Sequence, residues 1–143
     1  MAYSVSTDII NALSSDTVAQ LTDDTDGTTI DQSILTETIA NADSFINSYL
    51  RQQHSVPISP VPAMVKTLSI QVASKYLFDR RTHAEDSQVK DNYEKALEKL
   101  KQIAEHSLQI DDDDSVASQG TFWRANKDSD DQTYTDDELD KFI

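Results

Sequence analysis

Three histidines are the side chains best suited to bind a metal ion or to transfer a proton near neutral pH. His54, His83 and His106 lie in or next to different expected elements, and their spacing is not that of zinc ligands. No serine occupies a G-x-S-x-G sequence, and no glycine-rich phosphate loop occurs. The carboxylates lie on expected polar faces, where their pKa values should be ordinary. We therefore expect no catalytic residue, no metal site, no cofactor and no enzymatic activity, although a Ser-His-Asp grouping brought together by folding stays open.

The stretch TDDTDGTTID, residues 22–31, imitates part of a calcium-binding loop. Its third, fifth and sixth loop positions are occupied by Asp24, Asp26 and Gly27. The first position is a threonine, and the twelfth, where a bidentate glutamate belongs, is Ser33. We interpret the stretch as an acidic turn in which Gly27 supplies an unusual backbone angle and Asp31 caps the next helix. A cation bound between Asp23 and Asp31 is the alternative.

A basic pair, Arg80 and Arg81, ends one of the expected helices. Positive charge at a helix C-terminus interacts favourably with the helix dipole. We interpret the pair in this way, and pairing with an acidic partner is the alternative.

Two long helices on either side of a proline-rich elbow must position these residues. In residues 34–50, apolar side chains recur at alternating steps of four and three, which is typical of a helix with one buried face. They are Leu35, Ile39, Ala42, Ile46 and Tyr49. Residues 61–78 are apolar on most of the helix circumference, which predicts a helix in the middle of a bundle. Pro57, Pro60 and Pro62 separate the two helices, and Pro62 fits the first turn of the second.

Shorter stretches complete the expected bundle. Ser6 or Thr7 would cap a helix that reaches Leu13, and Ser15 would start another. Both helices are too short to be stable alone and must pack on the long ones. A third long helix is predicted by apolar residues at steps of four and three: Val89, Tyr93, Ala96, Leu100 and Ile103, with Leu97, Ala104 and Leu108 widening the stripe. The pattern covers fewer than three heptads, so we expect packing within the chain instead of a coiled coil.

These patterns predict an all-α fold, a small helical bundle of three long helices plus short N-terminal helices. The expected bundle comprises residues 1–110, and an extended acidic C-terminal arm comprises residues 111–143. The chain has 143 residues and no cysteine, which indicates a reducing compartment. No apolar run approaches the roughly 20 residues that cross a bilayer. The N-terminal residues lack the pattern of a signal peptide, so we expect a cytosolic or intracellularly assembled protein without membrane contact.

Negative charge is concentrated toward the C-terminus. The chain has a net charge of −14. Residues 1–110 carry 9 basic and 15 acidic residues, a net charge of −6, whereas residues 111–143 carry 3 and 11, a net charge of −8. Such a surface repels phosphate groups and anionic lipids, which argues against sequence-specific nucleic-acid binding. Taken alone, the acidity indicates only solubility.

The acidic arm contains more aromatic residues than a purely solvating tail needs. Thr135 and Glu138 form a capping box that predicts a short terminal helix. We predict that the arm binds a partner through Phe122, Trp123, Arg124, Tyr134, Leu139 and Phe142. Docking on a neighbouring molecule is the interpretation we favour, and folding back onto its own bundle is the alternative.

Five stretches in a fixed order carry a resemblance to a known family. They are YSVSTDII, QLTDDTDG, IDQSILTETIANADSFINSYL, VPISPVPAMVKTLSIQVASKYLFDRR and VKDNYEKALEKLKQIA, which together cover about residues 3–110. This order resembles the Mu-like phage family of head–tail connector proteins, also called neck or adaptor proteins. The features that match are an LTD turn, a VP-x-x-x-VP elbow and a helix that ends Tyr-x-Leu-x-x-Arg-Arg. The ending YTDDEL…F is a looser similarity, and the Asp-rich arm departs from the family's pattern.

The resemblance implies an all-helical head-completion subunit that assembles as a twelve-fold ring beneath the portal of a tailed phage. Its implied partners are the portal protein, neighbouring copies in the ring and a downstream neck or tail-completion protein. Genomic DNA would pass through the ring without specific binding. The protein would be made in the host cytoplasm and reside in the neck of the virion.

A different class of function stays open. A small acidic helical protein can act as a DNA mimic that inhibits a host DNA-binding protein, with carboxylates in place of phosphates. That function predicts acidic residues concentrated on one rigid face. Much of the charge here lies in the predicted arm instead, which favours the connector.

Overall fold

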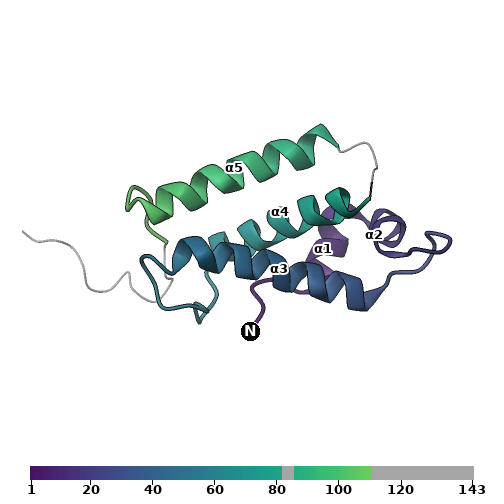
Figure 1. Ribbon diagram of the computed structural model, residues 1–143, viewed down its shortest axis with the longest axis horizontal. Coiled ribbons are helices and arrows are strands. Elements are labelled where there is room, and N and C mark those ends of the chain that lie inside the picture. The colour runs from purple at the N-terminus through teal and green to yellow at the C-terminus, as the bar shows by residue number, and fades with distance from the viewer. Residues whose placement is uncertain (82–85, 111–143) are drawn as a thin grey trace, which may run out of the picture. The chain divides into compact units, whose positions relative to one another are not determined.

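The computed structural model describes residues 1–81 and 86–110, which form five α-helices and no β-strand (Figure 1). In chain order the helices are α1 (Ser6–Leu13), α2 (Ser15–Thr22), α3 (Gln32–Leu50), α4 (Ala63–Arg80) and α5 (Ser87–Ala104). The predicted all-α fold of three long helices preceded by short ones is confirmed. The predicted arm, residues 111–143, lies outside the described residues.

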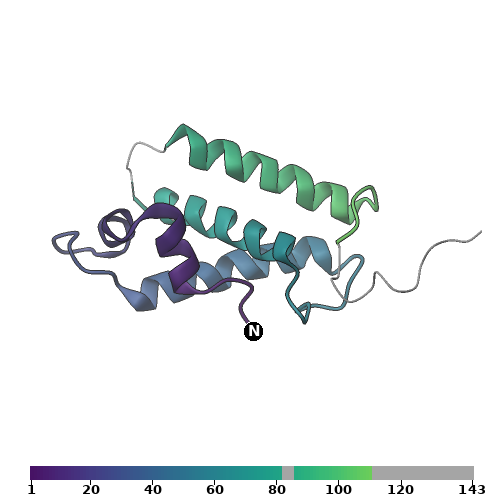
Figure 2. The ribbon, with the colours of Figure 1, turned by 180° about the vertical axis from the view of Figure 1, so that it is seen from behind.

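Helix α4 lies at the centre of the bundle, as its apolar circumference predicted. It contacts α1, α2, α3 and α5. The three long helices run side by side in alternating directions, and α1 and α2 lie at the end where α3 begins and α4 ends (Figures 1 and 2). Helix α5 packs on α3 and α4, so the prediction of packing within the chain is confirmed. None of the described helices is both long and apolar enough to cross a bilayer.

The predicted stripes form the core. The largest completely buried side chains include Leu35 and Ile46 of α3, Leu68 and Leu77 of α4, and Leu100 of α5. Burying a side chain of this size stabilises the fold by about 1.5–3 kcal/mol. The stripes are not covered along their whole width, because Tyr49 and Tyr93 are only partly buried.

Capping residues explain where several helices begin. The Asp31 carboxylate accepts hydrogen bonds from the backbone N–H groups of Ser33 (2.9 Å) and Ile34 (3.3 Å), so its predicted role as the cap of α3 is confirmed. The cap of α5 is Asp86, whose carboxylate accepts from the Gln88 N–H. Acceptors at these positions satisfy backbone donors that have no partner within the helix.

Three predicted boundaries are wrong. Helix α1 is capped by Val5 instead of Ser6 or Thr7, because the Asp8 carboxylate accepts a hydrogen bond from the Val5 N–H at 3.0 Å and stabilises the first turn. Pro62 precedes α4 in an extended conformation (ψ 145°) and is its N-cap, not part of its first turn. The third long helix ends at Ala104, and Leu108 packs on the core from the segment that follows.

Candidate functional site

Two histidines that the sequence assigned to different elements line the same cavity. His54 follows α3 and His106 follows α5. Both border a cavity of about 320 Å³ at the end of the bundle where α3 and α5 end. The neighbour of the His106 ring is the Gln53 amide, which also donates to the carbonyl oxygen of Ala104 at 3.0 Å. Within residues 1–81 and 86–110, no three His, Asp or Glu side chains are grouped so that they could hold a metal ion. His83 lies outside the described residues.

The acidic turn, residues 23–31, uses its carboxylates to hold its own backbone. One oxygen of Asp23 accepts from the Thr25 N–H (2.8 Å), and the other accepts from the N–H groups of Thr28 and Thr29 (both 3.2 Å). The Thr25 hydroxyl and N–H, followed by the Thr29 N–H, hold the pKa of Asp23 well below its ordinary value. Gly27 has φ +72°, so its predicted unusual backbone angle is confirmed. The Asp23 carboxylate thus has hydrogen-bond donors within the turn itself, and its position does not require a bound cation.

The basic pair at the end of α4 fastens the acidic turn to the bundle. Arg80 donates to the carbonyl oxygen of Leu21 at 3.1 Å and to the Asp24 carboxylate. Arg81 donates to the Asp23 carbonyl and, at 2.9 Å, to Asp24. The Arg80 hydrogen bond is the main reason why the pKa of Asp24 is lowered. The pair lies at the C-terminus of α4, as the dipole interpretation predicts, and it also pairs with an acidic partner in the same chain.

A buried polar cluster that the sequence analysis missed joins the N-terminal segment to α3 and α4. The Asp43 carboxylate accepts hydrogen bonds from the Tyr3 N–H at 2.9 Å and from the Ser69 hydroxyl at 2.7 Å. The Ser69 hydroxyl also contacts that of Ser4 at 2.8 Å. The Tyr3 hydroxyl accepts from the backbone N–H of Ile58 in the elbow at 3.1 Å. We call Tyr3, Ser4, Asp43 and Ser69 the Asp43 cluster.

Burial raises the pKa of Asp43, although the hydrogen bonds from Ser69 and Tyr3 act in the opposite direction. The expectation of ordinary carboxylates on polar faces is wrong at this position. A signal was present in the sequence, because Asp43 stands four residues after Ile39 and three before Ile46, on the buried side of α3. The contacts of the cluster join the N-terminal segment to α3 and α4.

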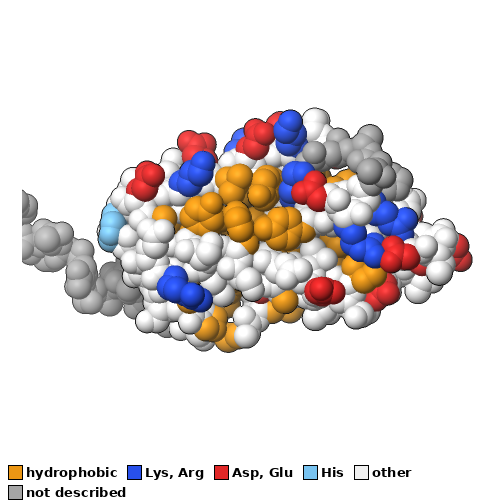
Figure 3. Space-filling view, viewed as in Figure 1, with side chains coloured by type: hydrophobic (Ala, Val, Ile, Leu, Met, Phe, Trp, Pro, Cys, Tyr) orange, Lys and Arg blue, Asp and Glu red, His pale blue; other side chains and the backbone are white. Residues whose placement is uncertain are grey.

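A group of partly exposed aromatic side chains lies on the side shared by α3, α4 and α5. We call Phe45, Tyr49, Tyr76 and Tyr93 the aromatic face. The Phe45 ring meets those of Tyr49 (5.3 Å between centroids) and Tyr76 (6.3 Å) edge-on. Figure 3 shows hydrophobic side chains gathered in the middle of this side of the molecule. All four residues are only partly buried.

Tyr93 belongs to the same group. Burial raises the pKa of Tyr76 and Tyr93, and the nearby tyrosine hydroxyls, including that of Tyr49, raise both further. The Lys75 ammonium lies 5.9 Å from the centre of the Tyr93 ring. Partly exposed aromatic side chains supported by three helices are typical of a protein–protein contact. The aromatic face is therefore our candidate functional site.

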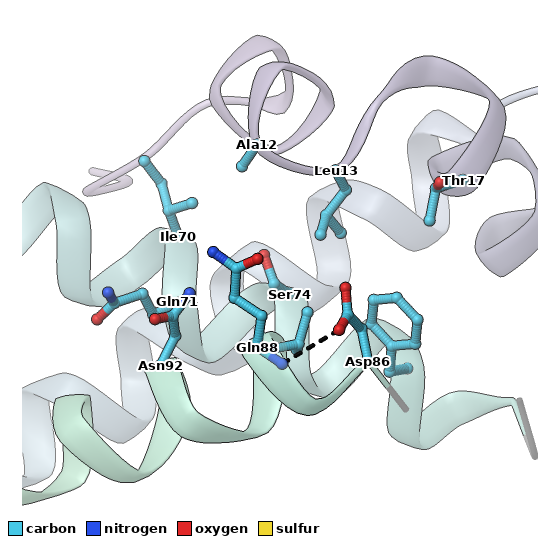
Figure 4. Close-up of a pocket in the computed structure, with 11 residues that line it drawn as sticks. Ala12, Leu13, Thr17, Ile70, Gln71, Ser74, Asp86, Gln88 and Asn92 are labelled. Carbon is cyan, nitrogen blue, oxygen red and sulfur yellow. Dashed lines mark hydrogen bonds between the residues drawn. The ribbon is translucent and has the colours of Figure 1, made fainter. Parts of the chain in front are cut away.

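A second hollow lies where α1 and α2 meet α4 and α5. It has a volume of about 270 Å³. Figure 4 shows Gln88 of α5 and Ser74 of α4 facing each other beneath Ala12 and Leu13. Its other polar lining consists of the Thr17 hydroxyl and two amides, Gln71 and Asn92. The one ionisable side chain in the lining, Asp86, caps α5. The hollow can form hydrogen bonds but lacks a paired acid and base.

The residues predicted to bind a partner cannot be located on this structure. Phe122, Trp123, Arg124, Tyr134, Leu139 and Phe142 all lie outside the described residues. The aromatic face was not predicted as a site, because Tyr49 and Tyr93 were assigned to buried stripes.

Comparison with known proteins gives one family. Residues 3–123 match the family model described as Bacteriophage Mu, Gp36. A search of curated proteins finds no match to this chain.

Proposed function

Because this match spans most of its length, the chain belongs to the bacteriophage Mu Gp36 family and is a bacteriophage protein, and on that premise we propose that it is a head–tail connector subunit. In this proposal, copies assemble as a twelve-fold ring beneath the portal protein, in the neck of the virion. The ring extends the DNA channel and binds the downstream neck or tail-completion protein. The subunit is made in the host cytoplasm and acts without catalysis.

The observation that carries the proposal is the aromatic face. A bundle of this size has enough buried aliphatic residues to form its own core, and yet Phe45, Tyr49, Tyr76 and Tyr93 remain partly exposed on three helices. Exposed apolar groups of this kind usually mark a contact with another protein. A ring subunit needs such contacts with its neighbours, and many weak contacts made together on a portal give strong avidity.

The charge supports the same function. A net charge of −14 repels DNA, so DNA can move through a ring of these subunits without being retained. The competing hypothesis, a DNA mimic, requires a continuous acidic face. Helix α5 instead interleaves four lysines with its acidic residues: Lys90, Lys95, Lys99 and Lys101. No acidic face of that kind runs along this helix.

Assembly on the portal tests the proposal. We expect the purified protein, mixed with the portal protein of its own phage, to co-elute with it in gel filtration and to appear as a ring by electron microscopy. Replacing Tyr76 with serine should weaken co-elution, whereas Val5→Ser, a change at an exposed apolar residue on the N-terminal segment, should not. Failure of the unaltered protein to bind portal would refute the connector function.

A further inference from the structure

We infer that the aromatic face binds the segment 111–124 of a neighbouring copy, with Phe122 and Trp123 as its anchors. The inference builds on the proposed ring, because it names the contact between adjacent subunits. Its test, however, requires neither portal nor ring.

The face has the chemistry to receive aromatic side chains. Phe45 and Tyr49 come from α3, Tyr76 from α4 and Tyr93 from α5, so the surface is supported by three packed helices and is rigid. The existing ring pairs meet edge-to-face, at an interplanar angle of 68°. Aromatic side chains prefer such edge-to-face contacts, and a tryptophan or phenylalanine contributes large apolar area at low entropic cost.

Charged side chains of both signs border the face (Figure 3). On α5, Lys90 lies three residues before Tyr93 and Lys101 eight residues after it, which places all three along one side of the helix. The Lys75 ammonium lies over the Tyr93 ring while pairing with Asp79. On the α3 side, Phe45 is flanked at helical spacing by the uncharged side chains Asn41 and Ser48. An acidic segment would therefore meet lysines on α5 that alternate with Glu94 and Glu98, and it would meet Glu37 on the α3 side, where that residue lines a hollow with Tyr76.

The occupant is identified by the sequence that follows the bundle. The described part ends at Ile110, and four consecutive aspartates, residues 111–114, come next, followed by Phe122 and Trp123. Aromatic anchors complement an aromatic surface, and the four aspartates can approach Lys90 and Lys101 on its α5 border. The twelve residues from Ile110 to Phe122 can extend over about 40 Å, so the anchors can lie well beyond the end of α5. The family match also continues past the bundle to Trp123.

Each copy would then offer one segment and one face. The contact is head-to-tail, because the surface that binds differs from the surface that is bound. Head-to-tail contacts generate closed rings when the rotation between neighbours closes. The inferred contact is thus of the type that the proposed ring requires.

Trp123 is the only tryptophan in the chain, so its fluorescence reports on this segment alone. The donor is the full chain with Phe45→Ser, which retains both anchors and has an impaired face. The acceptor is the full chain with Phe122→Ser and Trp123→Ser, which has an intact face and no tryptophan signal. As acceptor is titrated into donor, we expect the Trp123 emission to shift to shorter wavelength until it saturates, and quenching by acrylamide to decrease. Added salt should weaken the effect.

Two further acceptor variants test whether the shift depends on the aromatic face. An acceptor that also carries Tyr93→Ser should lose the shift, and one that also carries Val5→Ser should keep it. Circular dichroism of each variant verifies that the helices are intact. The inference is overturned if the acceptor produces no shift, or if the Tyr93→Ser acceptor produces the same shift. It is also overturned if Trp123 is already shielded in the donor alone, because the segment would then bind elsewhere. Ring formation on portal without this shift would leave the connector function standing and remove only the inferred contact.

Discussion

Two groups of aspartates in this molecule use the same side chain in opposite environments. Asp43 is buried between α3 and α4, and burial raises its pKa. Asp23 and Asp24 lie in the exposed acidic turn, where hydrogen bonds and arginines lower their pKa values. Each group fastens a segment without regular structure to the bundle, one at the N-terminus and one before α3. The comparison indicates that burial makes a carboxylate costly to ionise, and that its hydrogen-bond donors decide whether the site is still stabilising.

The Asp43 cluster should be the more sensitive of the two. Asp43→Ala leaves the Tyr3 N–H and the Ser69 hydroxyl without their acceptor, and we expect it to lower the free energy of unfolding by about 2–4 kcal/mol. Asp43→Asn retains an acceptor and should cost about 1 kcal/mol. Urea denaturation followed by circular dichroism measures both. Equal losses for the two variants would show that the retained shape and single acceptor of asparagine do not help, which would contradict this expectation.

The acidic turn should respond more weakly because it is exposed. Arg80→Ala removes the hydrogen bonds to Leu21 and Asp24, and we expect a loss of about 1 kcal/mol. The effect should be local, with faster hydrogen exchange at the Thr28 and Thr29 amides. Arg51→Ala, at an exposed arginine that ends α3, is the matched control and should change neither measurement. Unchanged exchange in the Arg80 variant would contradict the proposed fastening.

The smallest expected effect is on the pH dependence of stability, which should have opposite sign for Asp43 and for Asp24. Asp43 has a raised pKa in the folded state, so its protonation favours folding below the ordinary value of 3.8, and this contribution is lost as pH rises through the raised pKa. Asp24 has a lowered pKa, so its contribution is present above 3.8 and is lost as pH falls below it. Denaturation of the unaltered protein, Asp43→Asn and Asp24→Asn between pH 3 and 7 provides the measurement. Relative to the Asp43 variant, the unaltered protein should lose stability with rising pH, and relative to the Asp24 variant, with falling pH. Slopes of the same sign would contradict this assignment.

Local patterns in the sequence predicted much of the fold. The stripe that contains Leu35 and Ile46, the cap at Asp31 and the positive φ of Gly27 each depend on a few neighbouring residues, and all are confirmed. The boundary of α1 was missed because its first turn is held by a side chain inside the helix. The Asp8 carboxylate reaches back and accepts a hydrogen bond from the Val5 N–H. The predicted arm and its partner-binding residues stay predictions, since they lie outside the described residues.

The candidate site could be predicted only in part. A helical stripe shows which side of a helix faces the bundle, but not how completely neighbouring helices cover that side. Tyr49 and Tyr93 were rightly assigned to the inner side of their helices, yet neighbouring helices cover each of them incompletely. How much of a stripe stays exposed depends on the spacing and angle of the helices that pack on it.

By itself, the sequence determined the helices, their buried sides and the family, because these follow from short-range periodicity and from the order of motifs along the chain. Only the tertiary structure decided that Asp43 is enclosed, that Arg80 and Arg81 grip the acidic turn, and that four aromatic rings share one surface. The Asp43–Ser69, Arg81–Asp24 and Phe45–Tyr76 contacts each join residues 26 or more positions apart in the chain. No local pattern encodes which distant side chains packing brings together.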